Sequence, residues 1–164
     1  MLALLIITFG ILSRIIIHTP NFTPVLSLAL FGGMYLKGRQ GIWVPLALMA
    51  VSDVAIGFHD TMVYTWGSIL MISLIGLWLK EHKSVINMVS ASMLSALLFF
   101  VVTNFGAFLS LYPHTLAGLQ ECYIAAIPFY RSTMVSTVAY SLVLFSAWEF
   151  LLARRQNSLL LKLL

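Results

Sequence analysis

Charged side chains are scarce in this sequence. Only 9% of its 164 residues are charged and 61% are hydrophobic, and the mean hydropathy is +1.02. A soluble domain usually has about 25% charged residues, because its surface has to face water. The composition therefore excludes an ordinary soluble domain and predicts an all-α integral membrane protein in a lipid bilayer. At this length we expect one transmembrane domain, residues 1–164.

Cysteine and the motifs of common catalytic sites are also scarce. Cys122 is the only cysteine, so no disulfide can form within the chain. The sequence contains no His-Glu-x-x-His, no Gly-x-Ser-x-Gly and no glycine-rich phosphate loop. Cys122 and His114 lie eight residues apart, which is not a spacing typical of a nucleophile and its base. We therefore expect no enzymatic activity and no cofactor.

Long apolar runs make up most of the chain. Turns that contain proline, glycine or charged residues separate them, and the chain lacks the ten-residue alternation of a membrane β-barrel. We predict a six-transmembrane-helix bundle, because backbone groups in lipid have to be hydrogen-bonded within the protein. The six runs are residues 2–17, 25–36, 41–58, 62–79, 85–111 and 132–152.

Basic residues are distributed unevenly between the two ends of this predicted bundle. If the N-terminus is inside, seven lysines and arginines lie on the cytoplasmic side and only Arg14 and Arg131 lie outside. This asymmetry follows the positive-inside rule and predicts a cytoplasmic (inner) membrane location with both termini in the cytoplasm. It also explains the net charge of +4 without a nucleic-acid partner. The seven residues are Lys37, Arg39, Lys80, Lys83, Arg154, Arg155 and Lys162.

The 20 residues between the last two runs, 112–131, are too apolar for a solvated loop. Pro113 and Pro128 bracket the segment, and Thr115 is suited to cap a helix. We predict a short interfacial helix here, which either belongs to the aromatic belt or covers the outer mouth of the bundle as a lid. Its polar residues include Glu121, Cys122 and Tyr123.

Polar residues inside the runs gather toward the outer end. A charge at the centre of a span costs roughly 2.5–3.5 kcal/mol. Arg14 and Asp53 lie at similar depths, roughly 6 and 8 Å from the outer ends of their helices at 1.5 Å per residue, so we predict that they form an ion pair. Their role is either to fix helix packing or to bind substrate. The candidate substrate-binding residues are Arg14, His18, Asn21, Asp53, His59, Asn104, Glu121, Cys122 and Tyr123.

Two further possibilities concern single residues. Cys122 together with His18, His59 or His114 is an alternative set of metal ligands, and the sequence leaves it open. Glu149 lies near the cytoplasmic boundary, where we expect it to pair with a basic residue or to reach toward the headgroups.

Several segments also resemble a known family. The segments are Asn21-Phe-Thr-Pro-Val25, Ala29-Leu-Phe-Gly-Gly33, Val51-Ser-Asp53 with His59, Thr103-Asn-Phe-Gly106, Tyr112-Pro-His-Thr115 and residues 118–130. They resemble a small bacterial family of uncharacterised membrane proteins described as transport proteins. That family is similar in size and number of spans to the S-components of energy-coupling-factor (ECF) transporters.

The resemblance implies a six-helix protein that binds a vitamin or metal ion near the outer face. It also implies a coupling membrane protein and cytoplasmic ATPases as partners. The first helix has only Ala3 and Gly10 where S-components often carry Ala-x-x-x-Ala for docking, so a solitary importer is the other reading. We therefore expect a transport protein that binds a small-molecule nutrient. The alternative is a structural protein or oligomeric channel, in which Gly32-Gly33 and the small residues of 90–96 pack helices.

Overall fold

The computed structural model describes the backbone of residues 1–16 and 19–160 and the side chains as far as Gln156. His18 and Lys162 lie outside the described residues. The described chain contains six helices and no strand, which confirms the all-helical class. The first five helices begin and end within two residues of the predicted bounds. The helices are α1 (Leu2–Ile16), α2 (Val25–Tyr35), α3 (Gln40–Ile56), α4 (Met62–Glu81), α5 (Val85–Leu111) and α6 (Leu116–Leu160).

Three of these helices are long and apolar enough to cross a membrane. They are α4, α5 and the part of α6 from Leu116 to Gln156. The shorter helices α1, α2 and α3 have 15, 11 and 17 residues, or about 22, 16 and 25 Å at 1.5 Å per residue, against a hydrocarbon core of about 30 Å. The prediction of six membrane-spanning helices is therefore wrong. Apolar composition alone does not distinguish a spanning helix from one that is buried among its neighbours.

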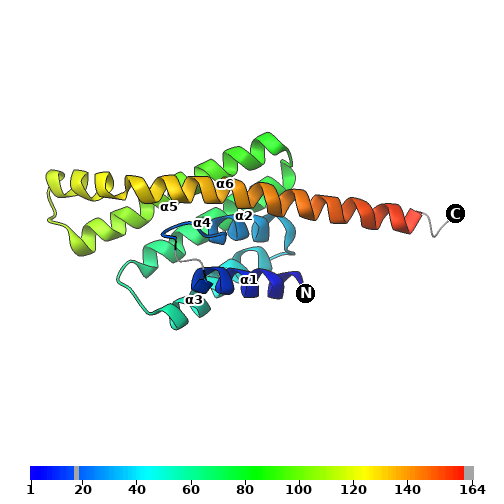
Figure 1. Ribbon diagram of the computed structural model, residues 1–164, viewed down its shortest axis with the longest axis horizontal. Helices are drawn as coiled ribbons and strands as arrows, with labels where there is room; N and C mark the ends of the chain where they lie inside the picture. The colour runs from blue at the N-terminus through cyan, green and yellow to red at the C-terminus, as the bar shows by residue number, and fades with distance from the viewer. Residues whose placement is uncertain (17–18, 161–164) are drawn as a thin grey trace.

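Helix α2 is the central element of the fold. It contacts α1, α3, α4, α5 and α6, and every residue from Val25 to Met34 is buried. In Figure 1 it lies in the middle of the bundle, between α1 and α6. A helix that is apolar on all sides is buried within protein or lipid, and α2 is buried within this protein. Pro24 before it and Gly38 after it limit its length.

Glycines allow α2 and α4 to approach each other closely. A Cβ atom on Gly33 would collide with the backbone oxygen of Ser73, and one on Gly76 would collide with the backbone oxygen of Leu30. Contacts between small residues stabilise helix association in membranes, where apolar side chains gain little by leaving lipid. Gly32 lies against Pro45 of α3. The predicted packing role of the Gly32-Gly33 pair is confirmed within the chain.

Helix α6 is continuous, which corrects the prediction of a separate interfacial helix over residues 112–131. Thr115 does cap a helix, since its Oγ1 accepts a hydrogen bond of 3.1 Å from the Gly118 N–H. That helix then continues through Pro128 to Leu160. In Figure 1 its first turns lie along the end of α5, in a hairpin that extends beyond α1–α4 at the left of the view.

The reason for this continuity is a buried stripe with helical spacing on both sides of Pro128. A proline inside a helix removes one hydrogen bond and usually bends the axis. Neighbouring helices compensate for this loss in membrane proteins, and α5 and α2 pack along α6. The buried positions are Gly118, Cys122, Ala126, Thr133, Ser136, Thr137, Ser141 and Phe145.

Candidate functional site

Arg14 and Asp53 form the predicted ion pair. Nη1 of Arg14 lies 2.7 Å from Oδ1 of Asp53, and their side chains are 17% and 1% exposed. The same nitrogen donates hydrogen bonds to Oγ of Ser52 and Sδ of Met49. Because its two N–H groups are directed at those acceptors, its contact with Asp53 is one of charge, and Oδ1 accepts no hydrogen bond from the described residues. The pair joins α1 to α3.

Trp66 of α4 binds the other oxygen of the same carboxylate. Its indole Nε1 donates a hydrogen bond of 2.7 Å to Oδ2 of Asp53. Three helices therefore meet at one buried carboxylate. Trp66 was not predicted as a site residue, although a signal was available. Helices α3 and α4 are consecutive in the chain and in contact, so residues at similar distances before and after their connecting turn come together.

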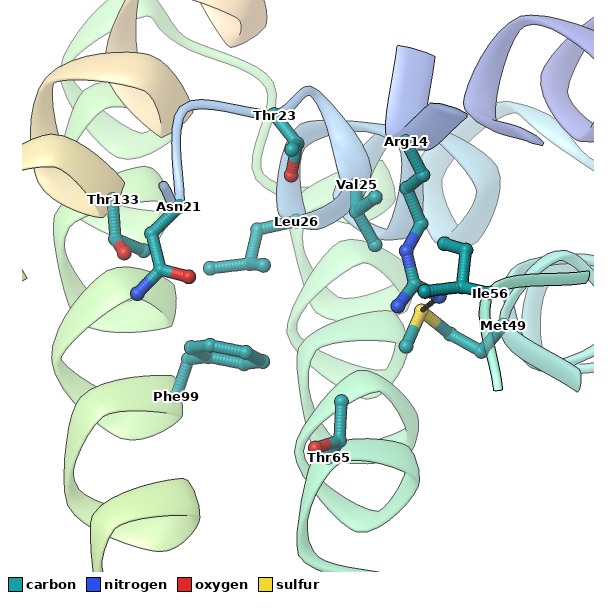
Figure 2. Close-up of a pocket in the computed structure, with 10 residues that line it drawn as sticks. All are labelled: Arg14, Asn21, Thr23, Val25, Leu26, Met49, Ile56, Thr65, Phe99 and Thr133. Carbon is teal, nitrogen blue, oxygen red and sulfur yellow. Dashed lines mark hydrogen bonds between the residues drawn. The ribbon is translucent and has the colours of Figure 1, made fainter. Parts of the chain in front are cut away.

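A cavity of about 220 Å³ lies beside this ion pair, and we call it the Arg14 cavity (Figure 2). It is next to the first turn of α2, where Pro24 is the N-cap residue and none of the described side chains caps the free N–H groups. Its polar side chains are Arg14, Asn21, Thr23, Thr65 and Thr133. Its apolar side chains are Val25, Leu26, Met49, Ile56 and Phe99.

The guanidinium of Arg14 is only partly used by the ion pair. Figure 2 shows one terminal nitrogen beside Met49 and the other turned toward the cavity. No described residue accepts a hydrogen bond from Nε or Nη2. These groups are donors only, since an arginine stays protonated in proteins. They are therefore available to an acceptor group inside the cavity.

A smaller cavity of about 80 Å³, the side cavity, shares Asn21, Phe99 and Thr133 with the Arg14 cavity. It extends between α5 and α6, where Thr103 and Asn104 line it. The two cavities are therefore neighbours that meet at these three side chains.

The predicted site residues fall into separate groups. Arg14 and Asn21 line the Arg14 cavity, and Asn104 lines the side cavity together with Asn21. Asp53 is fully buried and binds Arg14 without lining either cavity. His59 is exposed, and its Nδ1 lies 2.9 Å from Oγ1 of Thr61. His18 lies outside the described residues.

Of the three residues assigned to a lid, Cys122 and Tyr123 contact α5 instead. Glu121 is exposed. Sγ of Cys122 lies 3.4 Å from the backbone oxygen of Asn104, and the hydroxyl of Tyr123 donates a hydrogen bond of 2.7 Å to the backbone oxygen of Val101. None of the three lines either cavity. The lid prediction is wrong because the segment belongs to the continuous helix α6.

Within the described residues, no three histidine, cysteine, aspartate or glutamate side chains come together to hold a metal ion. Cys122 contacts a backbone carbonyl, and Nε2 of His114 lies 3.0 Å from the backbone oxygen of Leu109. The described side chains therefore do not assemble the alternative metal set around Cys122.

Glu149 lies at the opposite end of the bundle. Its Oε1 accepts a hydrogen bond from the hydroxyl of Tyr35 and lies 3.4 Å from Nζ of Lys83. The predicted pairing of Glu149 with a basic residue is confirmed, and the partner is Lys83 of the α4–α5 turn. Both side chains are about half exposed, so the pair contributes little to stability.

The threonines of the Arg14 cavity were not predicted as site residues. Thr65 and Thr133 are common helix residues in a membrane protein, and a single sequence gives no sign of which way they face. Thr23 lies in the short connection before α2, where the two prolines of residues 20–24 were the only signal.

Comparison with known proteins assigns the chain to a family. The model of DUF6580, a family of unknown function, matches residues 1–159, so the chain belongs to that family. No curated protein and no solved structure matches the chain.

Proposed function

We propose that this protein binds a small polar solute in the Arg14 cavity as a step in its uptake across the cytoplasmic membrane. The observation that carries the proposal is the position of Arg14. Asp53 and Ser52 hold one side of its guanidinium, and the remaining N–H groups find no acceptor among the described residues and face a cavity. A charge inside a membrane bundle is costly and usually serves a substrate or ion path.

The fold supports a position near the outer face. Helix α4 has 20 residues, which is about 30 Å and matches the hydrocarbon core. Thr65 is its fourth residue, so the cavity lies about 5 Å from that end of the helix. Lys37 and Arg39 follow α2, and Lys80 and Lys83 lie at the other end of α4. The positive-inside rule then favours a cytoplasmic position for that other end.

The connection between α1 and α2 borders the Arg14 cavity, through Asn21 and Thr23. Non-helical backbone within a membrane has to find hydrogen-bond partners in the protein or at a water-filled cavity. Oγ of Ser132 donates a 2.9 Å hydrogen bond to the backbone oxygen of Pro20, and Oγ of Ser136 donates one of 3.3 Å to that of Asn21. This connection therefore has partners in α6 where it borders the Arg14 cavity.

The size of the cavity favours a small nutrient. Its volume of about 220 Å³ is below the roughly 300–1,000 Å³ of sites that hold drug-sized ligands. A large vitamin such as a corrinoid would therefore not fit in this conformation. Uptake would proceed either with a coupling membrane protein and ATPases or by the chain alone.

A thermal-shift screen of the detergent-purified protein tests the proposal. The panel contains amino acids, small carboxylates, B vitamins and divalent cations. We expect at least one class to raise the melting temperature of the wild type and of the control Thr8→Phe, whose position on α1 is exposed. Thr65→Phe fills the cavity and should abolish the shift. If no class raises the melting temperature, or if Thr65→Phe keeps the shift, the proposal is wrong.

Uptake into liposomes then separates the two forms of transport. Accumulation of the stabilising solute by liposomes that contain the chain alone identifies a solitary importer. Binding without accumulation identifies a subunit that needs a coupling protein and ATPases.

A further inference from the structure

The hydrogen-bonding groups of the two neighbouring cavities differ from one end to the other. At one end, Arg14 presents only N–H donors. At the far end, Thr133 lines both cavities, and Thr103 and Asn104 line the side cavity. Figure 2 shows this separation for the main cavity, with Arg14 on one side, Asn21 and Thr133 on the other, and Leu26 and Phe99 between them.

The far end presents acceptors in Thr133, Thr103 and Asn104, each of which already donates a hydrogen bond to its own helix. Asn21, which lines both cavities, and Tyr130, which lines the side cavity, bring both donors and acceptors. Oγ1 of Thr133 donates to the backbone oxygen of Phe129 at 2.9 Å, and Oγ1 of Thr103 donates to that of Phe99 at 2.7 Å. Nδ2 of Asn104 donates to the backbone oxygen of Phe100 at 2.7 Å. A threonine that has donated its proton to its own helix keeps two lone pairs, and the asparagine keeps its carbonyl oxygen. These oxygens can accept hydrogen bonds from a ligand.

The described lining together with Asp53 behind it has no net charge. Arg14 is the only charged residue of the lining, and Asp53 neutralises that charge at 2.7 Å. Burying a ligand with a net charge here would leave that charge uncompensated, which is costly in an apolar environment. A ligand with two opposite charges avoids this cost if each charged group meets its own partners.

The geometry points to a small zwitterion, with a carboxylate and an ammonium group, as the solute of this site. The carboxylate would accept hydrogen bonds from Nη2 and Nε of Arg14. The ammonium would donate to the oxygens of Thr133, Thr103 and Asn104, beside the ring of Phe99, which also attracts a cation. Leu26 would contact the apolar part of the molecule between the two groups. This inference rests on the proposed solute site and names its substrate class.

Calorimetric titration of the detergent-purified protein with four matched compounds tests the inference. The compounds are 4-aminobutyrate and 2-aminobutyrate, which are zwitterions with different charge separations, and butyrate and n-butylamine, which carry one charge each. We expect 4-aminobutyrate, whose apolar part lies between its two charges, to bind at least tenfold more tightly than both singly charged compounds. Tighter binding of 2-aminobutyrate, whose charged groups share one carbon, would contradict the separation of the donor and acceptor ends. If butyrate or n-butylamine binds as tightly as the better zwitterion, the inference is wrong and the solute site remains.

A matched pair of threonine variants locates the ammonium end. Thr133→Val removes an acceptor from both cavities with little change in shape. Thr137→Val, one turn along α6, removes a buried hydroxyl that also bonds to its own helix but lines neither cavity. We expect Thr133→Val to weaken zwitterion binding at least fivefold and Thr137→Val to leave it unchanged. Equal effects in the two variants would overturn the assignment of Thr133.

The remaining outcomes separate the two proposals. If none of the four compounds binds while another solute class stabilises the protein in the thermal screen, the zwitterion inference is wrong and the proposed function stands. If no solute of any class binds, both are wrong.

Discussion

The indole Nε1 of Trp66 lies 2.7 Å from Oδ2 of Asp53, and this hydrogen bond joins α4 to α3 where Arg14 arrives from α1. The carboxylate is fully buried, so its two partners determine whether its charge is tolerated. A buried ion is stable only when hydrogen bonds and an opposite charge replace water. The polar centre of this bundle therefore depends on three side chains from three helices.

Asp53→Asn removes the negative charge that Arg14 faces. Breaking one partner of a buried ion pair leaves the other charge uncompensated, so we expect the free energy of unfolding to fall by about 3 kcal/mol. Reversible unfolding in mixed detergent micelles measures the change. Asp60→Asn, at an exposed position in the α3–α4 turn, is the control and should change stability by less than about 0.5 kcal/mol. Equal stabilities of the two variants would contradict the ion-pair role.

Trp66→Phe tests the second partner of Asp53. The variant keeps an aromatic ring but leaves Oδ2 without its donor, so we expect a loss of about 1–3 kcal/mol in the free energy of unfolding. Trp43→Phe is the matched control, because Trp43 on α3 is 64% exposed. The same unfolding assay compares them. A loss of the same size in both variants would show that the hydrogen bond to Asp53 contributes nothing.

Alanine substitutions at two glycines of α4 test the close contact between α4 and α2. A Cβ on Gly76 would meet the backbone of Leu30, whereas a Cβ on Gly67 has open space around it. Gly76→Ala should destabilise the protein by about 1–3 kcal/mol, the usual cost of overpacking. Gly67→Ala should stabilise it by up to about 1 kcal/mol, because alanine favours a helix. Differential scanning fluorimetry compares the melting temperatures of the two variants. A higher melting temperature for Gly76→Ala than for Gly67→Ala would contradict the close contact between α2 and α4.

The continuity of α6 through Pro128 can be measured as a distance. Spin labels at Ala117→Cys and Ala139→Cys, both exposed positions, require a Cys122→Ala background. The labelled positions are 22 residues apart, so a continuous helix places their Cα atoms about 33 Å apart. Two helices at right angles about Pro128 would place them about 23 Å apart instead. Pulsed electron spin resonance distinguishes these distances, and the shorter one would contradict a continuous α6.

Much of the helical pattern was predictable from the sequence. Prolines, glycines and charges mark the ends of the first five helices, and the estimated depths of Arg14 and Asp53 correctly predicted their pairing. The span count was wrong for two reasons. Helices α1 and α3 are apolar and only partly buried, but they have just 15 and 17 residues, and α2 is apolar for a different reason from α4. It is buried by protein on every side, and hydropathy gives the same signal for protein and lipid surroundings.

The site was less predictable, because it depends on which way side chains face. Arg14 and Asn21 were found as costly or unusual polar residues, whereas Thr133 and Thr65 look like ordinary membrane-helix threonines. The residues around Cys122 were misplaced, because Pro128 was taken as a helix boundary. Cys122, Ala126 and Thr133 lie on one buried stripe of α6. The packing of this stripe on α5 outweighs the one hydrogen bond that a proline removes from a helix.

Protection of a cysteine in the Arg14 cavity tests solute binding there most directly. Thr23→Cys in the Cys122→Ala background places a thiol in the cavity lining, and Thr19→Cys places one at an exposed position outside that lining. The modification rate by a small methanethiosulfonate reagent is measured with and without the solute that stabilises the protein most. We expect that solute to slow modification at position 23 at least fivefold and to leave position 19 unchanged. Unchanged rates at both positions under saturating solute would contradict a solute site in this cavity.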